Sequence, residues 1–316
     1  MRILIVGAGA VGQVYGWHLR AGGAQVAFFV RPKYVEELRG GFDVYPHIRT
    51  HARWDSPELY STAEEAGQVK WDQVWLCVSS TALAGAWLEA LCAAVAPAVV
   101  VCFTPGMKDG ELLAEKVGKD RVIMGMIPFI AWQAPLPGET LDPPGIAWYL
   151  PPFSPTPLSG PDAPTRAAVA ALKAGGLSAK QVANVAKTGA VGSGLLNPLM
   201  AHLELAGWSF ARFRAEQAEP AVETVREAMA IAAAWHNTKP PALAGLVGPG
   251  LVRLATRLAV WVMPFNIEVY LKYHFTKVGD QTRQSIGTWI VEGRKRGLSV
   301  AALERVAASL PTWGKA

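Results

Sequence analysis

The sequence has few cysteines, and their spacing matches no disulfide or metal motif. Among 316 residues there are three, Cys77, Cys92 and Cys102, without a C-x-x-C spacing. The absence of paired cysteines argues against a disulfide-bonded secreted protein, and these three are expected as buried packing residues in a reduced compartment. The chain opens at Met1 on a strand-like run that leaves no room for a signal peptide. We therefore expect a cytoplasmic location.

Charge is also scarce. Charged residues make up 17% of the chain and apolar residues 51%, which excludes a disordered protein. The net charge of +5 comes from scattered basic residues, the densest cluster being Arg294-Lys295-Arg296 at the end of an expected helix. No basic face with interleaved aromatic residues is visible, so nucleic-acid binding is not expected. The modest positive charge instead suits small anionic ligands.

No uninterrupted hydrophobic run has the composition of a membrane span. Leu243 to Met263 is strongly apolar, but it contains Arg253 and Arg257 and is broken by Gly248-Pro249-Gly250. This pattern predicts a buried helix and no membrane association. Trp261 within it is expected, like most of the tryptophans, to pack in the core.

A metal site is not expected either. His47 and His51 are four residues apart, but their surroundings are typical of a strand or loop and no third ligand is evident.

The sequence does contain a nucleotide-binding motif at its start. The apolar run Arg2 to Val6 is followed by Gly7-Ala8-Gly9-Ala10-Val11-Gly12, a helix-like segment and a second strand-like run, Gln25 to Val30. This is the β-α-β context that the G-x-G-x-x-G fingerprint requires. Gly7 permits the tight turn, Gly9 lets the backbone approach a diphosphate, and Gly12 allows close packing of helix on strand. The diphosphate would lie at the helix N-terminus.

The end of the second strand indicates which nicotinamide cofactor is bound. An Asp or Glu that would bind a free ribose 2′-hydroxyl is missing there, and Val30-Arg31-Pro32-Lys33 stands in its place. A guanidinium can grip a 2′-phosphate with two charged hydrogen bonds. We expect Arg31, assisted by Lys33, to select NADPH; the alternative for Arg31 is a solvated loop residue.

Hydrophobic patterning predicts an α/β fold, a Rossmann-type doubly wound sheet domain over residues 1–180, followed by an all-helical domain over residues 181–316. A hairpin or extra strand is expected over 42–54, and an antiparallel extension in 128–164, which holds 11 of the 23 prolines. The main expected helices span 13–21, 81–95, 111–116, 164–174, 184–213, 220–235, 246–275 and 279–296.

At this point the chain resembles the ketopantoate reductase family. The resemblance rests on the opening glycine motif, Arg31, Thr104-Pro105-Gly106-Met107, Leu196-Asn197-Pro198-Leu199 and Gly297-Leu298-Ser299-Val300. It implies NADPH-dependent reduction of a small anionic 2-oxo acid to a 2-hydroxy acid, a step toward pantothenate in the family. The segments expected to line the cofactor at the carboxyl ends of the strands add Ser79, Ser80, Thr104, Pro105 and Gly106 to the glycine loop.

Several polar positions depart from the family pattern. In the first helix of the second domain, Asn197 is kept, Ser193 replaces an asparagine, and Gly189 stands where the family has its catalytic lysine. Lys187, two residues out of register, is the nearest candidate acid, provided that glycines distort the helix; the alternative is a solvated lysine.

Three further family positions differ. Ser79 or Ser80 replaces a lysine, Pro105 replaces an asparagine, and Gln281, beside Asp280, replaces a substrate-binding glutamate. His202 could donate to substrate, but a packed polar helix residue is favoured.

We therefore expect an NADPH-dependent reductase of a small 2-oxo acid. The alternatives are a related reductase with a different carbonyl substrate, and a catalytically silent NADP-binding protein that acts as a sensor or interaction module. Whether the chain forms a homodimer is also left open.

Overall fold

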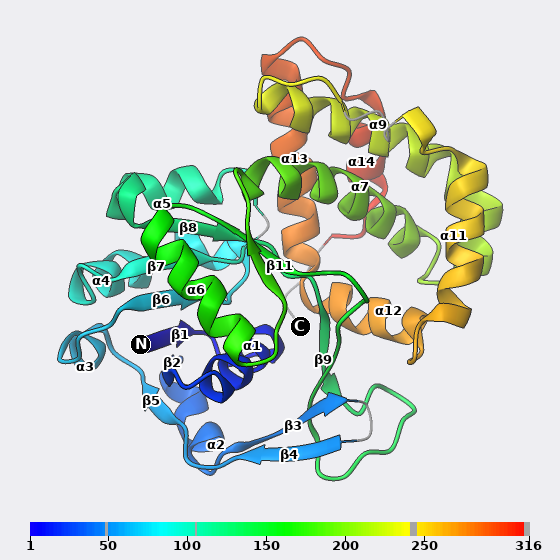
Figure 1. Cartoon of the computed structure of the whole chain (residues 1–316). Helices are drawn as coiled ribbons and strands as arrows, with labels where there is room; N and C mark the ends of the chain where they lie inside the picture. The colour runs from blue at the N-terminus through cyan, green and yellow to red at the C-terminus, as the bar shows by residue number, and fades with distance from the viewer. Residues whose placement is uncertain (48–49, 105, 241–244, 313–316) are drawn as a thin grey trace. The chain divides into compact units, whose positions relative to one another are not determined.

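The computed structural model describes residues 1–47, 50–104, 106–240 and 245–312 (Figure 1). The chain divides into two compact units, Met1–Ala186 and Lys187–Ala316. The first is an α/β unit built on a mostly parallel sheet, and the second is helical. The predicted fold class is confirmed.

The first unit is built on an eight-stranded sheet, and its core strands β8, β7, β6, β1, β2 and β5 are parallel. In their order across the sheet the strands are β12 (Ala179–Gln181), β11 (Thr156–Ser159), β8 (Val122–Gly125), β7 (Val99–Cys102), β6 (Gln73–Leu76), β1 (Arg2–Val6), β2 (Gln25–Phe29) and β5 (Glu58–Tyr60). The chain moves outward from β1 in one direction through β2 and later in the other through β6. Ligands bind at such a switch point, outside the carboxyl ends of the strands.

Helices cover both faces of this sheet, because its strands carry apolar residues on both sides. In β1, Ile3 and Ile5 pack on one face and Leu4 and Val6 on the other, all buried. The covering helices are α1 (Ala10–Ala21) and α6 (Asp162–Ala174) on the first face, and α3 (Ala63–Gly67), α4 (Trp87–Ala94) and α5 (Asp109–Val117) on the second.

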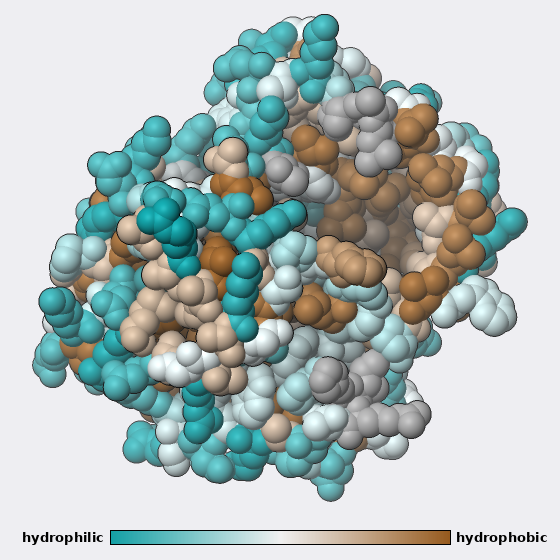
Figure 2. Space-filling view, viewed as in Figure 1, coloured by the Kyte–Doolittle hydropathy of each residue, from teal (hydrophilic) through white to brown (hydrophobic). Residues whose placement is uncertain are grey.

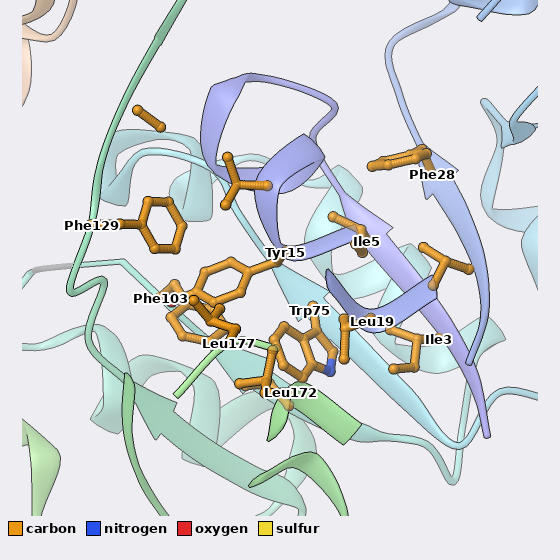
Figure 3. Packing of buried hydrophobic residues seen from close by; sticks show 14 of the residues in the cluster. Ile3, Ile5, Tyr15, Leu19, Phe28, Trp75, Phe103, Phe129, Leu172 and Leu177 are labelled. Atoms are coloured by element: carbon orange, nitrogen blue, oxygen red, sulfur yellow. The ribbon is translucent and has the colours of Figure 1, made fainter. Parts of the chain in front are cut away.

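An aromatic cluster holds α1 on the sheet (Figure 3). Tyr15 of α1 is fully buried and stacks on Phe103, with ring centroids 4.3 Å apart. Its ring also meets Trp75 and Phe129 edge-on, at 5.4 and 5.0 Å. Aromatic packing of this kind stabilises more than burial alone. It fixes the helix that begins at the glycine loop.

A second, four-stranded sheet packs against α1 from the side away from the main sheet. Its order is β4 (Thr50–Trp54), β3 (Phe42–His47), β10 (Gly145–Tyr149) and β9 (Ile130–Ala134). The hairpin expected over 42–54 and the antiparallel extension are both confirmed. The parallel pairing of β3 with β10, which joins them into one sheet, was not predicted.

The elements of the helical unit are α7 (Val185–Leu205), α8 (Phe210–Arg212), the π-helical turn η4 (Phe213–Gln217), α9 (Ala218–Trp235), α11 (Pro249–Val262), α12 (Ile267–Lys277), α13 (Gly279–Lys295) and α14 (Ala301–Ser309). The helices predicted over 220–235 and 279–296 are confirmed as α9 and α13, whereas those predicted over 184–213 and 246–275 are each divided.

The helix expected over 184–213 ends at Leu205, where Gly207 takes a φ of +65° and the Trp208 N–H bonds back to the Leu203 carbonyl. The one expected over 246–275 breaks before Asn266, which caps α12 through its side chain.

Another predicted helix, over 81–95, is also divided. A 3-10 turn, η2 (Ser80–Ala84), precedes α4, and extended backbone at Gly85 separates the two. A side chain on Gly85 would lie 2.5 Å from the Trp87 ring, so the break lets that ring fold back onto the turn. There the Trp87 indole N–H donates to the Ala82 carbonyl.

The prediction that residues 243–263 form a buried helix is wrong. In α11 only Val252 is buried, and the Trp261 side chain is 88% exposed. The apolar residues face outward because the helix packs on its neighbours through a narrow side. Within the described ranges, no helix is both long and apolar enough to cross a bilayer.

Candidate functional site

The glycine loop between β1 and α1 has a backbone that only glycines at two of its positions permit. Gly7 has a φ of +95°, and its N–H donates to the Phe29 carbonyl at 2.9 Å. A Cβ on Gly12 would lie 1.9 Å from the Gly7 carbonyl oxygen. A Cβ on Gly9, by contrast, would meet nothing within 4 Å. The loop therefore leaves no room for a side chain at Gly7 or Gly12, but it leaves space next to Gly9.

The start of α1 is suited to an anion. Gly9 is its N-cap residue and provides no side-chain cap, and the first turn contains no acidic residue. The backbone N–H groups of this turn have no acceptor within the helix, and the helix dipole favours negative charge there. The Gln13 amide donates to the Ala8 carbonyl at 2.9 Å and steadies the loop. Ala8, Ala10 and Val11 thus lie where a diphosphate would be held.

Two cations follow β2 and share one tyrosine. Arg31 donates to the Tyr34 hydroxyl at 2.9 Å, and its guanidinium lies 5.0 Å from the ring centroid. The Lys33 ammonium lies 4.9 Å from the same centroid. Among the described residues, neither cation pairs with a carboxylate, whereas the neighbouring Glu36 is bound by Arg39 at 2.9 Å. Arg31 and Lys33 therefore form a pair of cations that the Tyr34 ring holds in place and no carboxylate of the described residues neutralises.

Sequence reasoning missed Tyr34. Its signal was the three-residue spacing from Arg31, which the 3-10 turn η1 (Pro32–Tyr34) converts into a contact.

The loops that follow β6 and β7 are tied together by a buried carboxylate. The Ser80 hydroxyl donates to Asp109 Oδ2 at 2.7 Å. The Gly106 N–H approaches Ser80 Oγ and the same Asp109 oxygen, at 3.0 and 2.9 Å. Ser80 and Gly106, both expected at the site, are thus brought together. Asp109 was missed, although an acidic residue in the first turn of a helix is a recognisable anchor.

The other residues expected in these loops bond locally. The hydroxyls of Ser79 and Thr81 are 2.9 Å apart, and Thr104 Oγ1 lies 3.0 Å from Cys102 Sγ. Pro105 lies outside the described residues.

The cysteines contribute no reactive thiolate to the first unit. All three are free thiols, and Cys92 and Cys102 are buried as predicted. Burial raises the pKa of Cys102 to about 12 and also raises the pKa of Cys77. Both thiols remain protonated at neutral pH, and a protonated thiol is a poor nucleophile.

Two candidate substrate residues lie on one face of α7 in the helical unit. Ser193 and Asn197 are four residues apart, about one helical turn. Asn197 is 9% exposed. Neither side chain forms a hydrogen bond with another described residue. Their polar groups are therefore available to a ligand.

Lys187 lies on the first turns of the same helix, with an exposed side chain. A helix irregularity near the glycines, the condition under which Lys187 would come into register, does not interrupt α7, which runs from Val185 to Leu205. At about 100° per residue, Lys187 points about 80° away from Asn197 and about 120° away from Ser193.

His202 is a packed histidine, as favoured. Its two ring nitrogens lie 2.9 Å from Gln217 Oε1 and from Thr224 Oγ1. Burial lowers its pKa, so the ring is neutral at physiological pH. It links α7 to η4 and α9.

Asp280 and Gln281 lie in the first turn of α13, where the Gln281 N–H donates to Asp280 Oδ1 at 2.8 Å. Two residues on, Arg283 pairs with Glu204 of α7 at 2.8 Å, so a partly buried ion pair joins the two helices.

In the histidine pair considered as a metal site, His51 contacts a carboxylate of the same sheet. His51 lies 2.7 Å from Asp43, which also binds Arg53 at 2.7 Å. The His47 side chain is outside the described set. Elsewhere in the described ranges, no three His, Cys, Asp or Glu side chains gather as metal ligands would.

Comparison with known proteins supports one family. The family model of ketopantoate reductase PanE/ApbA matches residues 3–140. No curated protein sequence matches the chain.

Several solved structures share the fold over nearly its whole length. A ketopantoate reductase of this family from Ralstonia eutropha JMP134 is 21% identical, with a TM-score of 0.72 over 98% of this chain and 96% of the other. The 2-dehydropantoate 2-reductase from Methylococcus capsulatus is 18% identical, with a TM-score of 0.70 over 98% and 95%. D-mandelate dehydrogenase, solved with NADH and anilino(oxo)acetate, is 16% identical, with a TM-score of 0.69 over 98% and 96%.

These structural likenesses establish the common fold, and the family model identifies the domain that contains the glycine loop. Residues 3–140 carry the ketopantoate reductase PanE/ApbA domain.

Proposed function

We propose that the protein is an NADPH-dependent reductase that converts a small 2-oxo acid into a 2-hydroxy acid. The observation that carries the proposal is the pair of cations around Tyr34 at the end of β2, next to an acid-free helix start. A 2′-phosphate would give Arg31 and Lys33 the anionic partner that they lack among the described residues. A carboxylate at this place would instead favour NADH.

The proposed cofactor-binding residues belong to the first unit, and the proposed substrate residues belong to the second. The glycine loop and the start of α1 would hold the diphosphate, Arg31 and Lys33 the 2′-phosphate, and the loops with Ser79, Ser80, Thr104, Pro105 and Gly106 would line the cofactor. The chemistry that NADPH supplies when bound is hydride donation to a carbonyl carbon. Ser193 and Asn197 would donate hydrogen bonds to the substrate oxygens, with Asp280 and Gln281 as further polar partners. Lys187 remains the proposed acid for the oxygen that gains negative charge.

The cofactor assignment is tested by measuring the Kd of NADPH and NADH for the unmodified protein and for Arg31→Ala. Loss of hydrogen bonds to a charged group should weaken NADPH about 10- to 100-fold and NADH less than about twofold. Arg39→Ala is the matched control, since it removes an exposed arginine that already pairs with Glu36. Equal weakening of both cofactors by Arg31→Ala would remove the clamp assignment.

The catalytic assignment is tested by NADPH oxidation with a panel of 2-oxo acids. Lys187→Met should lower kcat about 100-fold or more if Lys187 is the acid, whereas Lys180→Met, another exposed lysine, should change little. Gly189→Lys places a lysine at the family position, where its Cβ would meet nothing within 4 Å. Unchanged activity in Lys187→Met together with a gain in Gly189→Lys would transfer the role to position 189.

The panel also separates the alternatives. Turnover only with carbonyl compounds that lack a carboxylate would favour a related reductase with another substrate. Tight NADPH binding without any turnover would favour a silent NADP-binding protein.

A further inference from the structure

The loops after β6 and β7 lie on the opposite side of β1 from Arg31. The strand order is β7, β6, β1, β2, and neighbouring strands are about 4.8 Å apart, so β7 is about 14 Å from β2. A dinucleotide binds across such a switch point, outside the carboxyl ends of the strands. With its 2′-phosphate at Arg31 and its diphosphate at the glycine loop, NADPH would extend its nicotinamide half over the loops after β6 and β7.

One carboxylate oxygen joins these two loops. Asp109 Oδ2 accepts hydrogen bonds from the Ser80 hydroxyl at 2.7 Å and from the Gly106 N–H at 2.9 Å. The Asp109 N–H donates in turn to the Gly106 carbonyl at 3.2 Å. Asp109 is 7% exposed and Ser80 5%, and hydrogen bonds are stronger where water is kept away. Asp109 therefore holds both loops in one arrangement.

The Asp109 carboxylate depends on these donors. It has no cationic partner among the described residues, although it lies in the first turn of α5, where the helix dipole favours negative charge. A buried carboxylate is costly unless hydrogen-bond donors satisfy it, so the Ser80 and Gly106 donors are kept on it.

The backbone at Gly106 is fitted closely to this carboxylate. A Cβ on Gly106 would lie 2.5 Å from Asp109 Oδ2 and would displace the Asp109 side chain. The loop after β7 thus rests directly on Asp109, so a change at Asp109 acts on the loop backbone without an intervening side chain.

We propose that Asp109 is a positioning residue for the nicotinamide half of NADPH. It holds the loops after β6 and β7 in the arrangement against which that half of the cofactor lies, while Arg31 holds the adenosine half. The inference rests on the NADPH binding proposed above.

The experiment compares two ligands by isothermal titration calorimetry. One is NADPH, and the other is adenosine 2′,5′-bisphosphate, which contains the adenosine half with its 2′-phosphate but no nicotinamide. Asp109→Ala should raise the Kd of NADPH about tenfold and that of the bisphosphate less than about twofold, because the loops that it releases face only the nicotinamide half. Arg31→Ala should instead weaken both ligands.

Two further variants make the comparison specific. Asp109→Asn keeps an oxygen that can accept from Ser80 and Gly106, so it should bind NADPH within about threefold of the unmodified protein. Glu111→Ala is the matched control, because it removes another acid from the first turn of α5 and should change neither Kd. The exposed residues of this helix, Glu111, Glu115 and Lys116, are all charged, and Figure 2 shows a mainly hydrophilic surface where Figure 1 draws α5.

Circular dichroism verifies that the variants fold. Should Asp109→Ala not fold, Ser80→Ala removes one of the two donors and should show the same preference at about threefold. Equal weakening of both ligands, or an unchanged Kd of NADPH, would overturn the positioning role and leave the proposed function intact. An unmodified protein that binds neither ligand would overturn the proposed function, and this inference with it.

Discussion

The chain has two glycine-rich segments, one in each unit, and they differ in what their glycines do. In the loop before α1, a side chain on Gly12 would lie 1.9 Å from a backbone oxygen. In α7, side chains on Gly189 and Gly192 would meet nothing within 4 Å, and one on Gly194 would come to 3.3 Å from the backbone of Ala228. In the first set the fold requires Gly7 and Gly12, whereas in the second it requires neither Gly189 nor Gly192.

This difference shows that a glycine motif indicates a binding site only where the backbone needs its glycines. The loop before α1 combines a turn, a close backbone approach and an open position at Gly9, each needed for a bound diphosphate. The α7 glycines do not interrupt the helix, and at two of the three positions they relieve no crowding. Three substitutions sharpen the comparison.

Gly12→Ala should have the largest effect. The methyl group would overlap the Gly7 carbonyl oxygen, so α1 must move from β1, at a cost of about 3 kcal/mol or more. Urea unfolding followed by tryptophan fluorescence measures the loss, and NADPH binding should disappear with it. Unchanged stability would mean that helix and strand are not as closely packed as the structure has them.

Gly9→Ala should separate binding from stability. Its backbone φ of −77° suits alanine and its Cβ would meet no protein atom, so the unfolding free energy should change by less than about 1 kcal/mol. The methyl group would occupy the place of the diphosphate and weaken NADPH at least about tenfold. Isothermal titration calorimetry gives the Kd, and undiminished affinity would exclude a diphosphate against Gly9.

Gly192→Ala should have the smallest effect, and of opposite sign. Alanine is favoured over glycine inside a helix by about 0.5–1 kcal/mol, and the exposed position has room for a methyl group. The same urea titration should therefore show a small gain. A loss of stability would indicate that α7 needs flexibility or close packing at this point.

Local patterns in the sequence predicted most of the α/β unit. The continuous apolar run of β1, the glycine loop and the return through β2 are contiguous, so local hydrophobicity and turn chemistry suffice to identify them. The parallel pairing of β3 with β10 escaped prediction because it joins residues about 100 positions apart, such as Val44 and Ile146. Tyr34 and Asp109 escaped because their roles depend on a contact.

In the helical unit the sequence predicted the helical class. It did not predict where two of the helices break or which face of α11 packs against its neighbours. The turn at Gly207 and the break before Asn266 divide runs that look continuous in hydrophobicity. The apolar composition of α11 predicted burial, yet its leucines and Trp261 face outward. Composition measures how apolar a helix is, whereas the side that packs depends on neighbours from elsewhere in the chain.

The sequence by itself determined the dinucleotide-binding fold and its glycine loop, because these depend on residues close together in the chain. It also pointed to a cationic pair after β2, Arg31 and Lys33, in place of an acid. Only the tertiary structure decided that Tyr34 holds both cations, that Asp109 ties two loops through Ser80 and Gly106, and that Trp261 and the leucines of α11 are exposed. The Tyr34 contacts depend on a local 3-10 turn, whereas the others depend on how distant segments pack, which sequence periodicity does not encode directly.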